Sequence, residues 1–270
     1  MNRHIFTFSV IALLTTIGYA NEADSVFYET DEIEVTASRI RTPLPKASRI
    51  IGIMTQEQIN SYAVQSVNDI LKYAVGVDVR QRGPIGAQTD VGVRGGNFEQ
   101  VAILLDGINI CDPQTGHNSF DFPVDMSDID HIEVLEGPAG RAYGSSSLMG
   151  AINIVTKTAA RTQAQAHMEA GSWGYAAAGA RADAVSNGWN NMLSVNYGRS
   201  DGYSRSKAGR LNADMEYKKA FYKGGYMDDN IKVNWHAGAS IKDWGSNTFY
   251  SAKFDDQFEH TVKTYTALQA

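Results

Sequence analysis

The chain has 270 residues, a formal net charge of −6, a hydrophobic fraction of 43% and a mean hydropathy of −0.29. These values exclude a bundle of transmembrane helices, and the acidic charge without a basic cluster predicts no nucleic acid partner. The single cysteine, Cys111, excludes an internal disulfide. We interpret it as incidental rather than as a reactive thiol or a metal ligand, because no histidine stands at a recognisable spacing from it.

The first 20 residues have the three parts of a secretory signal peptide. Arg3 supplies the charged start, residues 5–17 form an apolar core, and Gly18-Tyr19-Ala20 places small residues where a signal peptidase cuts. The apolar run is shorter than the roughly 20 residues that a membrane-spanning helix needs. We therefore expect a signal peptide over residues 1–20 and an exported protein, with a flexible lead over residues 21–45.

Residues 46–158 have the mixed pattern of an α+β domain. We predict a buried strand over residues 50–54, followed by a helix that the capping box Thr55-Gln-Glu-Gln58 opens. Ser66 is expected to cap a second helix, which Gly76 ends. The remaining elements are strands over residues 77–82, 90–94, 101–105, 132–135 and 151–156, with a tight turn at Asp106-Gly107.

This α+β segment carries little that indicates catalysis. Asp125, Asp128 and Asp130 lie close together but resemble an exposed helix start rather than an acid–base pair. The six histidines form no metal-binding motif, and no dinucleotide or P-loop spacing is present. We therefore predict no enzymatic activity, no metal site and no cofactor.

Polar and apolar side chains alternate with a period of two in five stretches between residues 162 and 242. Residues 230–241 are apolar at every odd position, and aromatic side chains stand near the ends of several stretches. Such strands occur both in a soluble sandwich and in a membrane barrel, so the pattern alone leaves both open. Residues 210–219 follow the same rule: Leu211, Ala213, Met215 and Tyr217 share one face, and Arg210, Asn212, Asp214, Glu216 and Lys218 the other.

Several short motifs of the α+β segment occur in an order that indicates a family. They are Ser66-Val-Asn-Asp-Ile-Leu71 before Gly76, Val93-Arg-Gly95 before the run 101–107, Ile132-Glu-Val-Leu-Glu-Gly-Pro138, and the run 150–157. Together they resemble the plug domain of TonB-dependent outer-membrane transporters. The loop at 112–117 is similar to one in the branch that contains the cobalamin and siderophore receptors.

This resemblance implies a fold class: an α+β plug domain followed by antiparallel β-strands of an incomplete transmembrane β-barrel, over residues 159–270. In the family the plug blocks a barrel of about 22 strands in the cell outer membrane. The apolar faces of the strands would then meet lipid, and the polar faces would meet a lumen. The lead is too short for an added signalling domain or β-sandwich, which favours a small chelate, either siderophore-bound iron or cobalamin, as the ligand.

The resemblance also assigns roles to residues. A TonB box, which the TonB energy-transducing complex binds by strand addition, would be Glu32, Ile33, Glu34, Val35, Thr36 and Ala37. The alternative is that this segment is the first strand of the plug. Ligand-binding candidates in the plug loops are Gln81, Arg82, Gln88, Asp112, Gln114, His117 and Asn118, each of which could equally be a solvated loop residue.

Two arginines are candidates for contacts between plug and barrel. Arg94 corresponds to a family arginine that faces barrel glutamates, and the alternative is a surface arginine beside a turn. Arg141 stands two positions away from the place of a second family arginine. Three hypotheses concern the whole chain: it is the N-terminal part of a full transporter, a split or frameshifted product inactive in uptake, or a plug-only binding protein.

Overall fold

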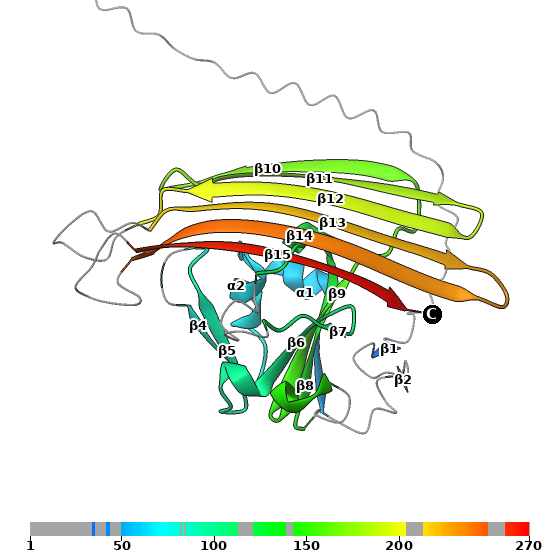
Figure 1. The fold of residues 1–270 in the computed structure, drawn as a ribbon, viewed down its shortest axis with the longest axis horizontal. Helices are drawn as coiled ribbons and strands as arrows, with labels where there is room; N and C mark the ends of the chain where they lie inside the picture. The colour runs from blue at the N-terminus through cyan, green and yellow to red at the C-terminus, as the bar shows by residue number, and fades with distance from the viewer. Residues whose placement is uncertain are drawn as a thin grey trace, which may run out of the picture. The chain divides into compact units, whose positions relative to one another are not determined.

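The computed structural model describes residues 34–35, 42–43, 50–81, 83, 85–112, 121–138, 143–203, 213–247 and 257–269 (Figure 1). These residues form a five-stranded sheet, a six-stranded sheet and two two-stranded sheets. The predicted signal peptide lies outside the described residues. In the part of the chain that the structure describes, no helix is long and apolar enough to cross a membrane.

Two short helices begin where the sequence predicts. Thr55 and Gln58 form the expected capping box at the start of α1 (Gln56–Ser61). Ser66 caps α2 (Val67–Leu71) by accepting a hydrogen bond from the backbone of Asp69. The expectation that Gly76 ends this helix is wrong, because α2 stops at Leu71 and the chain then turns before Gly76 adopts a φ of 76°.

The five-stranded sheet has the order β3-β8-β9-β6-β7, and only β6 and β9 run parallel. Its central strands β6 and β9 are mostly apolar, and every residue of both is buried. The predicted buried strand at 50–54 is instead an edge strand, half-buried because it pairs along one side only. The strands are β3 (Ile51–Met54), β6 (Val101–Leu105), β7 (Ile108–Asn109), β8 (Ile129–Glu136) and β9 (Gly150–Thr156).

Shorter elements connect this sheet. Asp106 and Gly107 both have positive φ, at 49° and 81°, and form the predicted tight turn between β6 and β7. A separate hairpin pairs β4 (Val77–Gln81) with β5 (Thr89–Val93), and a second pairs β1 (Glu34–Val35) with β2 (Thr42–Pro43). Single 3-10 turns are η2 (Phe98–Gln100), η3 (Met126–Asp128) and η4 (Ser145–Ser147).

The six-stranded sheet is an antiparallel meander in chain order, and Figure 1 shows its long strands side by side. It is open among the described residues, because β10 and β15 each pair along one edge. Two connections at one end are short, and Trp189, Tyr226 and Trp235 pack together there. The strands are β10 (Gln163–Ala170), β11 (Ala176–Ser186), β12 (Trp189–Ser200), β13 (Met215–Met227), β14 (Lys232–Asn247) and β15 (Gln257–Gln269).

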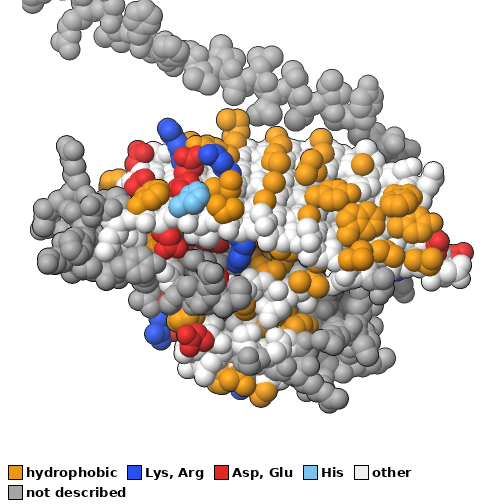
Figure 2. Space-filling model, in the orientation of Figure 1, with side chains coloured by type: hydrophobic (Ala, Val, Ile, Leu, Met, Phe, Trp, Pro, Cys, Tyr) orange, Lys and Arg blue, Asp and Glu red, His pale blue; other side chains and the backbone are white. Residues whose placement is uncertain are grey.

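In much of this sheet polar side chains are buried and apolar side chains are exposed, which is the reverse of the pattern in a soluble protein. On β12, Leu193 and Val195 are 51% and 47% exposed. Ser194 and Asn196, which alternate with them, are 1% and 6% exposed. Figure 2 shows rows of hydrophobic side chains over the outer surface of the sheet. The polar face therefore lies inward and the apolar face outward, which is the arrangement of a strand whose outer neighbour is lipid.

The two faces predicted for residues 210–219 are present in the described part of β13, but the apolar face points inward and not towards lipid. Met215 and Tyr217 point inward, where they pack with Tyr175 and Trp244, and Lys218 is exposed on the outer face. Period-two alternation gives two faces but not their direction, and this inward apolar cluster fills space beside the plug. Further along the same inward face, Lys219 and Lys223 stand on either side of the buried Phe221.

Candidate ligand-binding cavity

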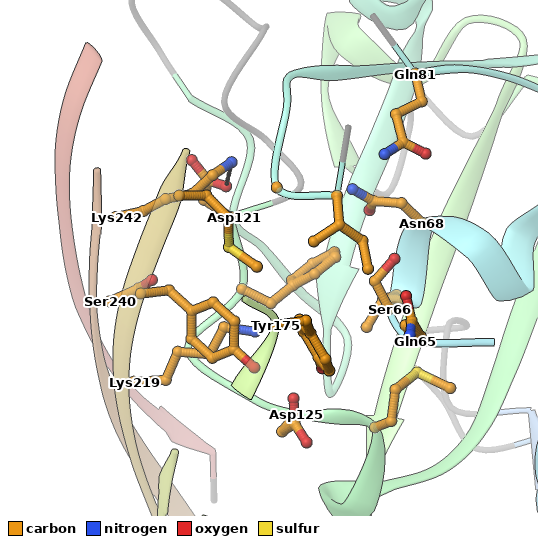
Figure 3. Close-up of a pocket in the computed structure, with 17 residues that line it drawn as sticks. Gln65, Ser66, Asn68, Gln81, Asp121, Asp125, Tyr175, Lys219, Ser240 and Lys242 are labelled. Atoms are coloured by element: carbon orange, nitrogen blue, oxygen red, sulfur yellow. Dashed lines mark hydrogen bonds and ion pairs between the residues drawn. The ribbon is translucent and has the colours of Figure 1, made fainter. Parts of the chain in front are cut away.

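A cavity lies between the α+β segment and the inner face of the six-stranded sheet (Figure 3). A narrow part of about 80 Å³ shares lining residues with a wider cleft of about 630 Å³. The α+β segment contributes the start of α2, the end of β4 and residues 121–126. The sheet contributes Tyr175 and inward side chains of β13 and β14.

The start of α2 presents polar groups to this cavity. Asn68 donates a hydrogen bond to the Thr89 hydroxyl at 3.0 Å, which fixes the orientation of its amide. Its carbonyl oxygen is buried and accepts no hydrogen bond from the described residues. Buried acceptors are nearly always satisfied in folded proteins, so this oxygen is a free hydrogen-bond acceptor for a ligand or water.

The sheet presents two ammonium groups and a phenol. Lys242 binds Asp121 at 2.7 Å, and Lys219 donates to the Val124 carbonyl at 3.1 Å. The Tyr175 hydroxyl donates to the Glu169 carboxylate at 3.0 Å. Figure 3 shows these groups converging on the cavity from the side opposite Ser66 and Asn68, so a bound molecule would contact both parts of the chain.

The ligand-binding residues predicted from the sequence have different places. Gln81 lines the cavity and accepts a hydrogen bond from Lys72 at 3.0 Å. Gln88 is only 3% exposed and donates to Asp90 at 3.0 Å, so it supports the β4–β5 hairpin rather than the cavity. Asp112 is half-buried and does not line the cavity. Arg82, Gln114, His117 and Asn118 lie outside the described residues.

The cavity also has lining residues that were not predicted. Ser66 was singled out only as a helix cap, and the lysines only as part of an alternating pattern. The available signal was the acidic run 121–130, whose carboxylates had no local cations to neutralise them. The missed lining residues are Ser66, Asn68, Asp121, Asp125, Tyr175, Lys219 and Lys242.

The prediction that Asp128 lies at an exposed helix start is wrong. It is fully buried in η3 and accepts a hydrogen bond from the Ser194 hydroxyl of β12 at 2.8 Å. Burial raises the pKa of its carboxyl above the ordinary value. A carboxyl that was assigned to solvent therefore joins the α+β segment to the sheet.

A second polar contact joins the two parts at the Asp106-Gly107 turn. Lys223 of β13 lies 3.2 Å from the Asp106 carboxylate and donates to the Thr156 hydroxyl at 2.8 Å. Asp106 in turn accepts hydrogen bonds from the backbone and hydroxyl of Thr156, at 2.9 and 2.6 Å. The three groups form a closed, largely buried network.

Arg94 has a partner within the α+β segment. It follows β5 with a φ of 51°, and its guanidinium pairs with Glu136 at the end of β8 at 2.5 Å. This contact joins two strands of the same segment, and a contact with the barrel wall stays a prediction for Arg94. Arg141 lies outside the described residues.

The predicted TonB box is described at two positions. Glu34 and Val35 form β1, which pairs with Thr42 and Pro43, so the backbone is extended there. Glu32, Ile33, Thr36 and Ala37 lie outside the described residues. Among the described residues, β1 pairs along one edge only.

Among the described residues, no group of three or more His, Cys, Asp or Glu side chains could hold a metal ion. The Cys111 sulfur accepts a hydrogen bond from the backbone of Ile103 at 3.2 Å. It therefore has a packing role beside β6.

The arrangement of the α+β segment and the sheet has a counterpart among known families. Residues 44–151 match the family model described as the TonB-dependent receptor plug domain. Residues 44–151 are therefore a plug domain of the TonB-dependent receptor type. TonB-dependent receptors are outer-membrane proteins, and the outward apolar face of the six-stranded sheet fits that location.

Curated relatives of this chain include vitamin B12 transporters BtuB. That of Vibrio vulnificus is 31% identical over 156 residues, 58% of this chain and 25% of the relative. That of Vibrio cholerae is 30% identical over 165 residues, 61% of this chain and 26% of the relative. This chain thus spans about a quarter of the length of these relatives.

Solved structures show the same fold at lower identity. The pyoverdine outer membrane receptor FpvA of Pseudomonas aeruginosa covers 78% of this chain with a TM-score of 0.64 and 15% identity, and the match spans 31% of FpvA. The siderophore receptor PiuA of Acinetobacter baumannii covers 75% with a TM-score of 0.58 and 18% identity, across 28% of PiuA. These likenesses support the plug followed by antiparallel strands as the fold.

Proposed function

We propose that this chain is the N-terminal part of a TonB-dependent transporter that binds a small chelate and imports it by rearrangement of the plug. The observation that carries this proposal is the cavity between the plug and the polar face of strands whose other face is apolar and exposed. A plug beside such a wall blocks a passage, and a polar cavity between them is a place where a ligand can contact both.

The ligand class follows from the relatives and the cavity. The curated relatives are vitamin B12 transporters, and the structural relatives include pyoverdine and siderophore receptors. The cavity has hydrogen-bond acceptors from α2 and cationic donors from β13 and β14, which suits a chelate with several polar groups. Cobalamin and siderophore-bound iron are the two proposed ligands.

The proposed coupling site is the TonB box at residues 32–37. An extended segment with a free edge can add as a strand to the sheet of a partner, and its alternate side chains then set the register. The extended pairing of Glu34 and Val35 supports this proposal. The proposed division of the chain is a signal peptide over 1–20, a lead over 21–45, the plug over 46–158 and barrel strands over 159–270.

The test is uptake by cells that produce the protein from its complete gene and lack other receptors for the two ligands. We expect energy-dependent uptake of labelled cyanocobalamin or of a labelled ferric siderophore. Val35→Pro removes one backbone N–H donor and should abolish uptake, while binding of the ligand to the cell surface is retained. Val35→Thr keeps the donor and the branched side chain, and should transport normally.

Two results would contradict the proposal. Normal uptake by Val35→Pro would show that this segment does not couple transport to energy. Surface binding with no uptake by the unchanged protein would favour a binding protein without transport activity.

A further inference from the structure

The inner faces of β13 and β14 carry an unbalanced positive charge. Lys219, Lys223 and Lys242 point inward, and no inward residue of these two strands is a carboxylate. Each of the three lysine side chains donates a hydrogen bond to the plug, and Lys219 and Lys242 also lie over the rings of Tyr217 and Trp244 of the sheet. The inner faces of these two strands, taken alone, are therefore cationic.

The charge that balances these lysines comes from the plug. Asp121 pairs with Lys242 at 2.7 Å and Asp106 pairs with Lys223 at 3.2 Å. Lys219 donates to the Val124 carbonyl, and Asp125 and Asp121 also act on it electrostatically. Neutralisation of this part of the wall thus depends on the plug staying in place.

Another strand of the same sheet neutralises its charge differently. On β11, Arg181 and Asp183 form a two-contact ion pair at 2.9 and 3.1 Å, and both side chains are almost fully buried. Both partners of that pair belong to the sheet, so neither charge is supplied by the plug. The sheet can therefore balance an inward cation within itself, and on β13 and β14 it does not.

Plug rearrangement has a specific consequence for these lysines. If residues 121–126 move away, the ammonium groups of Lys219 and Lys242 lose their plug partners, while the Tyr217 and Trp244 rings remain beside them. An unpaired, partly buried cation is unfavourable, and an anionic group that takes the vacated place restores the balance. The Asp121 carboxylate then occupies, in the closed state, the position of an acidic group of the ligand.

We propose that Lys219 and Lys242 form a binding site for a carboxylate or phosphate group of the transported chelate, and that Asp121 competes for this site. The inference rests on the proposed function and narrows it to acidic chelates. The two lysines line the cavity together with Ser240, so a ligand that enters reaches them without passing the plug core. Lys223 lies deeper, beside the Asp106-Gly107 turn.

The test uses citrate as a small carboxylate probe. Its binding to the protein, produced from the complete gene and purified in detergent, is measured by titration calorimetry. Asp121→Asn removes the competing charge and should tighten citrate binding roughly tenfold to a hundredfold, the effect of one charged hydrogen bond. Adding Lys242→Gln or Lys219→Gln to this variant should remove the gain. Lys218→Gln is the matched control, because Lys218 is adjacent in sequence but exposed on the outer face.

Asp121→Asn should strengthen citrate binding and the lysine substitutions should weaken it. These opposite effects distinguish a binding site from a structural contact. If Asp121→Asn and Lys242→Gln only loosened the plug, both would change citrate binding in the same direction, and the proposal would be wrong. It would also be wrong if Asp121→Asn bound citrate no better than the unchanged protein. Because this measurement needs no energy coupling, its failure is distinct from a failure of transport.

Discussion

Replacing Lys223 by methionine tests whether the polar network at the Asp106-Gly107 turn holds the plug against the wall. The side chains of Lys223 and Asp106 are 12% and 9% exposed, and their charges lie 3.2 Å apart. At an effective dielectric constant of about 20, this attraction is roughly 5 kcal/mol before desolvation. Removing one partner of such a pair costs about 3–5 kcal/mol, because the other charge is left uncompensated.

We expect a value near the lower end, since Asp106 keeps two hydrogen bonds from Thr156. A loss of about 3 kcal/mol corresponds to roughly a hundredfold faster hydrogen exchange of amides that become accessible when the plug leaves the wall. Mass spectrometry of exchange in β9 and the β6–β7 turn would measure it. Lys218→Met, on the outer face, should leave exchange unchanged. Equal exchange in Lys223→Met and the unchanged protein would refute the idea that this network fastens the plug.

Two further predictions concern the plug and the lipid face. Burial lowers the pKa of His131, but hydrogen bonds to Asp130 and Glu133 outweigh burial and raise it from 6.5 to about 9. The charged imidazole therefore stabilises the plug fully below pH 6.5 and loses this effect as the pH rises towards 9. The difference in unfolding free energy between the unchanged protein and His131→Gln, measured by denaturation, should shrink from pH 6.5 to pH 9. A constant difference would contradict the assignment. Val195→Lys places a charge on the outer face of β12 and should destabilise the folded protein in lipid vesicles by about 2–4 kcal/mol, with Val195→Leu nearly neutral. Equal stability of these two variants would show that this face does not meet lipid.

The elements that local chemistry determines were predictable. Thr55 with Gln58 opens α1, Ser66 caps α2, and the alternation of residues 230–241 gives β14 two distinct faces. These features depend on residues within a few positions of one another. They needed no knowledge of what packs against them.

The residues whose direction or burial was predicted wrongly have partners that are distant in the sequence. The inward direction of Met215 follows from its packing with Tyr175 and Trp244, and Asp128 is buried because β12 supplies Ser194 as a donor. The cavity likewise joins residues 65–68 to β13 and β14, which are far from them in the sequence. A period of two gives each strand two faces, but only the assembled plug and wall decide which faces inward.

The two lysine–aspartate contacts between the plug and the sheet, Lys223–Asp106 and Lys242–Asp121, lie at different positions along the strands. Lys223 is level with His236 on β14, next to the aromatic cluster at the short connections, and Lys242 lies six residues further along that strand. At about 3.4 Å per residue this separates them by roughly 20 Å. If the proposed coupling pulls the plug from the end with short connections, the Lys223 contact would be loaded before the Lys242 contact. Contacts that break one after another need a smaller peak force than contacts that must break together, so the spacing of the two lysines along the strands would lower the force that this proposed movement requires.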